Sequence, residues 1–137
     1  MADAQNKRTF GLFSHAQAGN TTLAEGLLFA CGATTRKGTV AEGNTVSDYS
    51  ADEIERKNSI SASLLNCTWQ GVSLQFIDTP GYADFIGEVI SSLRSIDAAV
   101  IVVDAASGVE VGTERVWGFL EELNLPCLIF VNKLDKE

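Results

Sequence analysis

The sequence predicts an α/β fold, in which a mostly parallel sheet with one antiparallel strand carries helices on both faces. Residues 98–103 and 127–131 are continuous apolar runs, which are typical of strands buried on both faces of a parallel sheet. Strand-like segments also alternate with amphipathic helical segments along the chain. The chain has 137 residues, of which 45% are hydrophobic and 20% charged, so its length and composition fit one globular domain.

The first half of the chain contains a strand, a helix and a long polar segment. Residues 9–14 are apolar and predict the first strand. Residues 21–31 carry leucines at helical spacing, and Gly32 follows as a stop signal. Residues 34–59 are polar, so we expect a long mobile segment with a helical turn around residues 52–57.

A hairpin follows the polar segment. Residues 60–66 alternate, with Ile60, Ala62 and Leu64 on one face, and residues 72–77 are expected to pair back with them. This pair supplies the one antiparallel strand of the predicted sheet.

Two further helices are expected, over residues 85–95 and 110–123, each beside one of the two apolar runs. Ligands bind at the carboxyl ends of strands in such sheets. Polar residues follow several of the predicted strand ends, so we expect a ligand site at that edge.

The terminal and compositional features favour a cytoplasmic protein that does not span a membrane. Residues 1–8 are polar and are expected to be disordered, and no apolar run approaches the length of a membrane span. The formal net charge is −8, which argues against a basic nucleic-acid surface. Three widely spaced cysteines without a CxxC pair predict reduced, buried thiols.

The loop from Ser14 to Thr22 lies between the first strand and the first helix, where a phosphate-binding loop belongs. In the pattern G-x-x-x-x-G-K-[ST], backbone amides cradle phosphates, a lysine reaches the outer phosphates, and a hydroxyl holds magnesium. Here Ser14 replaces the first glycine and Asn20 replaces the lysine, which removes a charge-assisted contact worth roughly 1.5–3 kcal/mol. An ordinary strand-to-helix loop is the alternative. The candidate phosphate ligands are Ala16, Gln17, Ala18, Gly19, Asn20, Thr21 and Thr22, with Thr21 also a candidate for magnesium.

The sequence Asp78-Thr79-Pro80-Gly81 follows the predicted strand 72–77. The Asp78 carboxylate can hold a magnesium-bound water, and the Gly81 amide can meet a terminal phosphate. A plain turn is the alternative. Ser59 is a further candidate magnesium ligand, unless it only caps a strand, and Asp104 is expected to be structural.

The sequence Asn132-Lys133-Leu134-Asp135 follows the second apolar run. The Asp135 carboxylate can accept both N–H donors of a guanine edge, which adenine lacks. The Lys133 stem can cover the base plane, and Asn132 can hold the phosphate loop. A charged turn at a strand end is the alternative.

The segments SHAQAGNTTLAEGLL, DTPGYADFIGEV, VVDAASGVEVGTE and FVNKLDKE, taken in this order, resemble the GTPase domain of bacterial elongation factor G. More narrowly they resemble the elongation factor G-like paralogues, which carry tyrosine at the position of Tyr82. The resemblance extends from Thr9 to the end of the sequence.

This resemblance implies the P-loop NTPase fold and a ribosome-dependent GTPase that uses GTP or GDP with Mg²⁺. Residues 9–137 would be a partial GTP-binding domain that lacks its C-terminal end. The segment 34–59 would be switch one, and Gly81 and Tyr82 would act at the catalytic step within switch two. Tyr82 stands where the main family has a histidine that helps to orient the attacking water.

Two hypotheses follow. The leading one is binding and hydrolysis of guanine nucleotide. The alternative is a degenerate module that keeps the fold without turnover, since Asn20 replaces the lysine. An ATP or dinucleotide enzyme is disfavoured because no G-x-G-x-x-G follows the first strand. We also expect self-association through an apolar sheet edge at residues 127–131, which would lack a neighbouring strand.

Overall fold

The sheet has five strands in the order β2-β3-β1-β4-β5, and the computed structural model describes residues 6–135. Strand β2 is antiparallel to β3, and the other neighbouring pairs are parallel. This arrangement confirms the predicted mostly parallel sheet with one antiparallel strand. The strands are β1 (Lys7–Ser14), β2 (Ser63–Trp69), β3 (Val72–Asp78), β4 (Ala98–Asp104) and β5 (Cys127–Asn132).

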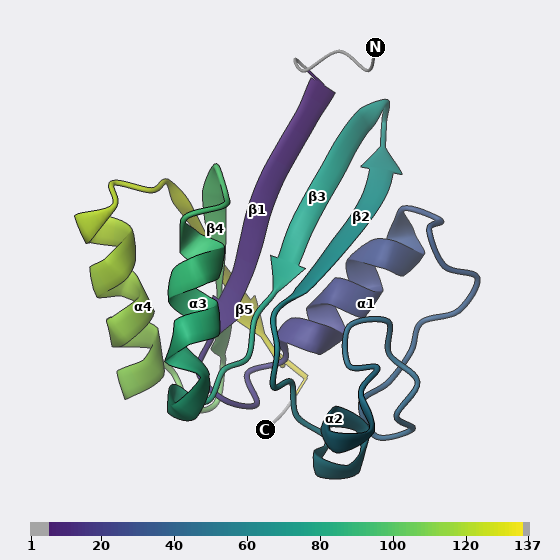
Figure 1. The fold of residues 1–137 in the computed structure, drawn as a ribbon, viewed down its shortest axis with the longest axis horizontal. Helices are drawn as coiled ribbons and strands as arrows, with labels where there is room; N and C mark the ends of the chain where they lie inside the picture. The colour runs from purple at the N-terminus through teal and green to yellow at the C-terminus, as the bar shows by residue number, and fades with distance from the viewer. Residues whose placement is uncertain (1–5, 136–137) are drawn as a thin grey trace.

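Helices cover both faces of the sheet, as predicted. Figure 1 shows α3 and α4 together on one side of β1, and α1 with the short α2 on the other. The short helix η2 leads directly into α3. The helices are α1 (Asn20–Ala30), α2 (Ala51–Arg56), η2 (Ala83–Phe85), α3 (Ile86–Leu93) and α4 (Val111–Glu122).

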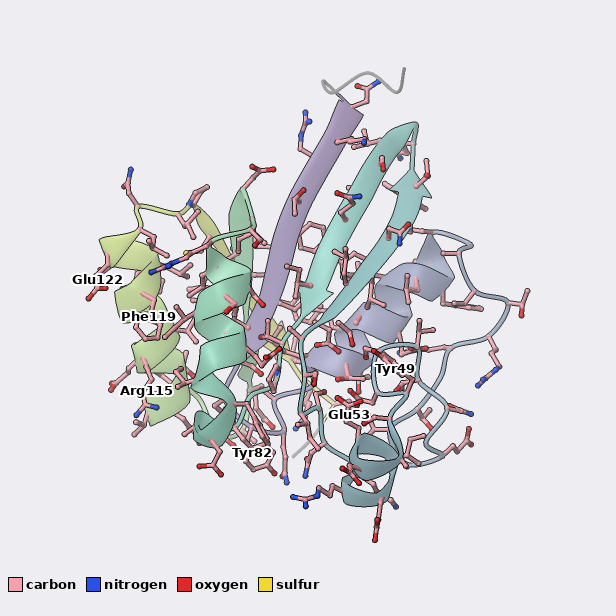
Figure 2. The ribbon with its side chains drawn as sticks, in the orientation of Figure 1. Tyr49, Glu53, Tyr82, Arg115, Phe119 and Glu122 are labelled. Carbon is pink, nitrogen blue, oxygen red and sulfur yellow. The ribbon has the colours of Figure 1, made fainter. Side chains whose placement is uncertain are left out.

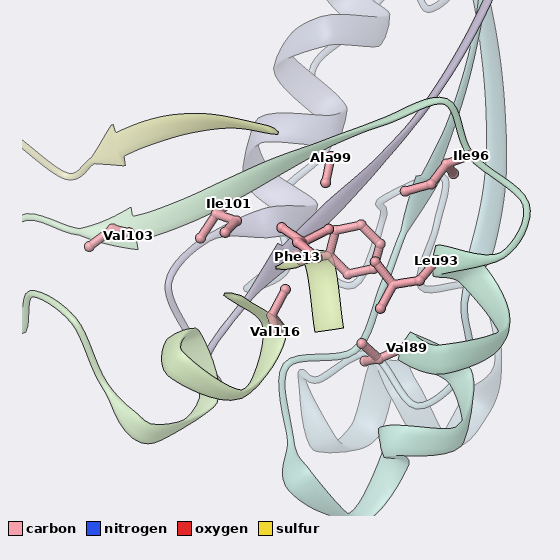
Figure 3. Close-up of a cluster of buried hydrophobic side chains, with 9 residues drawn as sticks. Phe13, Val89, Leu93, Ile96, Ala99, Ile101, Val103 and Val116 are labelled. Atoms are coloured by element: carbon pink, nitrogen blue, oxygen red, sulfur yellow. The ribbon is translucent and has the colours of Figure 1, made fainter. Parts of the chain in front are cut away.

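Successive residues of β1 point to opposite faces of the sheet and so build two cores. Phe13 lies in the core beneath α3 and α4, among Val89, Leu93 and Val116 (Figure 3). Leu12 lies in the core beneath α1. Both side chains are 0% exposed, so β1 anchors both layers and fixes the loop that follows it.

The start of the first strand and the buried face of β2 differ from expectation. Residues 1–8 were expected to be disordered, but β1 begins at Lys7, so Lys7 and Arg8 belong to a strand. Residues 1–5 lie outside the described residues. The expected face of β2 is wrong by one residue. Leu65 is 5% exposed and packs in the core, whereas Leu64 is 64% exposed. Adjacent leucines give no alternation from which the phase could be read.

Strand β5 is an edge of the sheet, and its apolar residues are exposed. Leu128 and Val131 are 61% and 47% exposed, and Cys127 is exposed as well. The apolar run predicts a strand buried on both faces, and that expectation is wrong for β5, as is the expectation of a buried Cys127 thiol. The prediction of an exposed apolar edge is confirmed.

Candidate nucleotide-binding site

The loop between β1 and α1 has the backbone shape of an anion-binding turn. Gln17 has a φ of 65° and Gly19 a φ of 106°, and Gly19 directly precedes α1. A side chain at position 19 would collide with the Asn132 amide as well as being strained. The first amides of a helix have no carbonyl partner within the helix, so the start of α1, directly after Gly19, favours an anion. Within the loop, Ala18 is fully buried, and Thr22 is exposed at the cavity.

Asn20, at the position of the expected lysine, ties two strand ends together. Its side chain is 6% exposed, and its amide donates to the Leu12 carbonyl at 3.1 Å and to the Thr79 carbonyl at 3.2 Å. Its Oδ1 has no hydrogen-bond partner among the described residues. Asn20 thus stabilises the junction between β1 and the chain leaving β3, and it brings no positive charge to the loop.

The three predicted magnesium ligands come together at this junction. The Thr21 hydroxyl donates to Asp78 Oδ2 at 2.8 Å, and its oxygen lies 3.1 Å from Ser59 Oγ. Asp78 is 1% exposed, and burial raises its pKa to about 7, although the nearby Ser47 hydroxyl and the hydrogen bond from Thr21 act to lower it. Its second oxygen, Oδ1, is buried without a hydrogen-bond partner in the described part of the chain.

This oxygen set fits Mg²⁺. Mg²⁺ binds hard oxygen ligands and is usually held by one or two carboxylates together with phosphate and water. No group of three Asp, Glu, His or Cys within residues 6–135 could hold a metal alone, so the nucleotide would complete the coordination. Thr21 and Ser59 offer hydroxyls and Asp78 a carboxylate, and bound Mg²⁺ would neutralise phosphate charge.

A second carboxylate, Asp48, was missed by the sequence reasoning. It is 5% exposed, lines the same cavity, and has an Oδ2 without a partner within residues 6–135. Burial raises the pKa of Asp48, while the nearby Ser59 hydroxyl acts to lower it. A single Asp within a polar segment gives no periodic signal, so only the fold reveals its position.

The sequence after β3 packs closely on the phosphate loop. Thr79 Oγ1 donates to the Leu12 carbonyl at 2.6 Å. An added Cβ at Gly81 would lie 2.7 Å from the His15 carbonyl oxygen, so only glycine fits there. The Gln17 amide donates to the Tyr82 hydroxyl at 3.3 Å, and Tyr82 lies at the end of the molecule below α3 (Figure 2).

The residues after β5 support the same loop from the other side. Asn132 Nδ2 donates to the Ala18 carbonyl at 2.9 Å, and Lys133 Nζ donates to the Gln17 carbonyl at 2.6 Å. The predicted role of Asn132 in holding the phosphate loop is therefore consistent with its contacts. Asp135 follows two residues beyond Lys133 and is exposed.

Asp104 has the structural place that was expected for it. Its Oδ2 lies 2.6 Å from Lys133 Nζ, and its Oδ1 accepts the Ala106 amide at 2.9 Å. The hydrogen bond from Lys133 holds the pKa of Asp104 below its usual range. The ion pair with Asp104 holds the Lys133 side chain beside the loop and neutralises the charge of its ammonium.

Segment 34–59, expected to be mobile, is attached to α1 through Glu25. This side chain is 1% exposed, and its two oxygens accept the Gly38 amide at 2.8 Å and the Val46 amide at 2.5 Å. A buried carboxylate with backbone donors can replace its lost hydration. Glu25 therefore links the helix that begins at the phosphate loop to the polar segment.

Glu53 organises the end of the same segment. It forms a capping box with Ser50 at the start of α2, which confirms the expected helical turn. Its Oε1 accepts the Ile60 and Ser61 amides at 3.0 and 3.1 Å. Burial alone would raise the pKa of Glu53, but these hydrogen bonds lower it below its usual range. Figure 2 shows Glu53 and Tyr49 on this segment beside α1.

One cavity of about 230 Å³ unites these groups. Its wall contains the phosphate loop, the chain after β3, Lys133 and the end of the polar segment. The residues that line it include Gly19, Asn20, Thr21, Lys57, Ser59 and Tyr82. Asp78 lies buried beneath the cavity through its bond to Thr21.

Known proteins are similar to the chain in both sequence and fold. Residues 5–137 match the family described as the elongation factor Tu GTP binding domain. A ribosome-releasing factor 2, mitochondrial, from Candida albicans is 44% identical over 97% of this chain and 16% of its own length. An elongation factor G 2 from Streptomyces coelicolor is 42% identical over 94% of this chain and 19% of its own length.

Two solved structures resemble the fold. One, a protein from Thermus thermophilus, is 42% identical, with a TM-score of 0.92 over 95% of this chain and 20% of its own. The other is translation elongation factor SelB from Methanococcus maripaludis in complex with the GTP analogue GppNHp. It is 26% identical, with a TM-score of 0.67 over 93% of this chain and 22% of its own.

The fold and its site therefore define a nucleotide-binding domain of the translational GTPase class. The chain belongs to the elongation factor Tu GTP binding domain family. The relatives confirm the resemblance to elongation factor G, and the chain spans less than a fifth of their length. Among residues 6–135, no helix combines the length and apolar character needed to cross a membrane.

Proposed function

We propose that this chain binds GDP and GTP with Mg²⁺ in the cavity above the phosphate loop. The observation that carries the proposal is the convergence of three separate segments on that loop. Thr21, Asp78 and Ser59 meet within hydrogen-bond distance, and Asn132 holds the loop from the opposite side. A plain set of strand-end turns would not need this arrangement.

The same proposal assigns the base to the Asp135 side. The exposed carboxylate of Asp135 accepts the two N–H donors of guanine, and the Lys133 stem, fixed by Asp104, covers the base. Adenine offers no such pair of donors and would leave the carboxylate unpaired, so the site prefers guanine.

Hydrolysis would proceed by attack of water on the γ-phosphorus, with cleavage of the bond to the β–γ bridging oxygen, giving GDP and inorganic phosphate. The Gly81 amide meets the terminal phosphate, and the Tyr82 hydroxyl orients the water. Gln17 positions that hydroxyl through its 3.3 Å hydrogen bond. By family resemblance, the ribosome is the partner that stimulates this step.

A non-hydrolysing module is the second candidate, and the contacts of Asn20 favour it. The Asn20 amide is committed to two backbone carbonyls and carries no charge. A site built in this way can bind nucleotide while contributing less to the charge that develops during phosphoryl transfer. Phosphate release from GTP, measured with and without ribosomes, separates the two candidates, since only the hydrolytic one predicts ribosome-stimulated release.

Isothermal titration calorimetry tests the binding proposal. We expect GDP with Mg²⁺ to bind with a dissociation constant on the order of 100 μM or tighter. EDTA should weaken this binding, and ATP should fail to compete. Absence of heat with GDP and Mg²⁺ at high-micromolar protein, or a preference for ATP, would contradict it.

We propose further that the 137-residue chain self-associates through β5. An exposed apolar edge strand presents unpaired backbone groups as well as apolar side chains. Phe130→Lys should reduce the mass measured by light scattering. A monomeric unsubstituted chain would contradict this proposal.

The cytoplasmic location is likewise a proposal. Relatives whose names include "mitochondrial" provide the alternative compartment. Imaging of a fluorescent fusion distinguishes the two, and mitochondrial fluorescence would overturn the cytoplasmic assignment.

A further inference from the structure

The phosphate side of the cavity is rich in buried carboxyl groups. Asp48 and Asp78 are 5% and 1% exposed, and each has an oxygen without a hydrogen-bond partner in the described chain. The 137-residue chain carries a formal net charge of −8. A nucleotide polyphosphate therefore enters an unfavourable field unless cations offset it. One bound Mg²⁺ offsets only part of the charge of the polyphosphate.

The usual protein cation is missing from the loop, because Asn20 stands there. Three side chains that can carry positive charge line the cavity, His15, Lys57 and Lys133. His15 lies 3.2 Å from the Glu110 carboxylate, and Lys133 lies 2.6 Å from that of Asp104. Lys57 has no ion pair among residues 6–135, so it is the cavity-lining cation whose charge is available.

The backbone around Lys57 is held in place. Lys57 caps the end of α2 with a left-handed φ of 54°, and its amide bonds to the Glu53 carbonyl. The next turn wraps around the Glu53 carboxylate through Ile60 and Ser61. Two residues beyond Lys57, Ser59 lies 3.1 Å from the Thr21 hydroxyl. The base of the Lys57 side chain is therefore anchored beside the phosphate loop, while the ammonium is free to meet a ligand.

We propose that Lys57 supplies the phosphate-binding cation of this site, in place of a lysine at position 20. The proposal rests on the proposed nucleotide binding. The positive charge that binds phosphate would then come from segment 34–59 and not from the start of α1. An ammonium on a flexible stem is suited to this task, because it can approach phosphate oxygens from several directions.

This placement couples nucleotide binding to the order of segment 34–59. A phosphate that attracts Lys57 also holds Asn58 and Ser59 against Thr21, because the three residues are consecutive. Binding then stabilises the arrangement in which the segment covers the cavity. Nucleotide should therefore protect this segment from proteolysis, and the protection should depend on Lys57.

The test compares three variants of the 137-residue chain by calorimetry with GDP and Mg²⁺ at low salt. Lys57→Gln should bind about fivefold to tenfold more weakly, since a charge-assisted contact is lost. Lys57→Arg keeps the charge and should stay within about twofold of the unsubstituted chain. Arg56→Gln is the matched control. It removes one positive charge at the residue next to Lys57, and Arg56 does not line the cavity. It should change the affinity by less than about twofold.

Two further readouts separate a phosphate contact from a structural role. The difference between Lys57→Gln and the unsubstituted chain should shrink as salt rises to about 0.5 M, because salt screens the exposed ammonium. Asn20→Lys should raise the affinity for GDP about tenfold in the Lys57→Gln background. The gain should be smaller in the unsubstituted chain, because one cation can replace the other.

The outcomes are distinct. Equal affinities for Lys57→Gln and Arg56→Gln, or a loss that salt does not reduce, would overturn the assignment of Lys57 while leaving nucleotide binding intact. No binding by the unsubstituted chain would instead overturn the proposed function, and the inference with it.

Discussion

The phosphate side and the base side of the site differ in burial. The phosphate side is the more buried of the two, but its sequence motif is the weaker. On the phosphate side, β1 and β3 are central strands, and Asp78 and Asn20 are almost completely buried. On the base side, β5 is an edge strand and Asp135 is exposed. Yet Asn132-Lys133-Leu134-Asp135 agrees with its expected pattern, whereas the phosphate loop departs from its pattern twice.

Sequence agreement and structural support are therefore separate properties of this site. Asn20 departs from the pattern but makes two backbone hydrogen bonds that hold the site together. Asp135 fits the pattern, and its proposed role in base recognition depends on a ligand at the surface. Stability should therefore depend mainly on the phosphate side, and base selectivity on the base side.

The largest expected effect is on stability. Phe13→Ala should lower the free energy of unfolding by about 3–5 kcal/mol, because Phe13 is 0% exposed within a cluster of buried residues. Phe130→Ala on β5 should cost less than about half of that, because Phe130 is 37% exposed. Urea unfolding measures both. Equal losses would show that the two sides are equally well packed.

The next effect is on base recognition. Asp135→Ala should weaken GDP binding about tenfold to hundredfold, since two hydrogen bonds to a charged group are lost. Leu134→Ala, at a neighbouring residue that is 78% exposed, is the control and should change affinity by less than about twofold. Calorimetry measures both variants. A similar affinity for Asp135→Ala and Leu134→Ala would remove guanine recognition from this side.

A smaller and more local effect concerns the polar segment. Glu53→Gln should lower the protection of the Ile60 and Ser61 amides from hydrogen exchange by about 1–3 kcal/mol, because both amides donate to the Glu53 carboxylate. Glu55→Gln, on the exposed side of α2, is the matched control. If both variants exchange like the unsubstituted chain, Glu53 does not hold the segment.

Acid should release the same contact. The pKa of Glu53 is lowered in the folded chain, so its contribution is fully present above its ordinary value of 4.5 and is lost as pH falls through the lowered pKa. We expect the protection of the Ile60 and Ser61 amides, corrected for intrinsic exchange, to fall in that acidic range. In Glu53→Gln this fall should be absent, and its persistence would point to another group.

Sequence patterns predicted the features that depend on local periodicity. The strands, the helices and the mostly parallel pairing follow from apolar spacing, and the approach of Thr21 to Asp78 follows from the neighbouring parallel strands β1 and β3. Ser59 precedes β2, so its approach to Thr21 depends on how the polar segment folds. The face of β2 could not be predicted, because Leu64 and Leu65 are adjacent.

The remaining site residues depend on contacts between distant segments. Asp48 and Lys57 lie in a polar segment without periodicity, and Glu25 reads as an ordinary helix residue. Their roles appear only when the segment folds back on α1. The Ser50-x-x-Glu53 spacing was a usable signal for the capping box.

Guanine-nucleotide binding across both sides of the site can be seen in a crystal structure of the chain with GDP and Mg²⁺. We predict electron density for phosphates beside Gly19 and Thr21, for a metal near Asp78, and for the base beside Asp135. Density for the nucleotide elsewhere, or for a base turned away from Asp135, would contradict this binding mode.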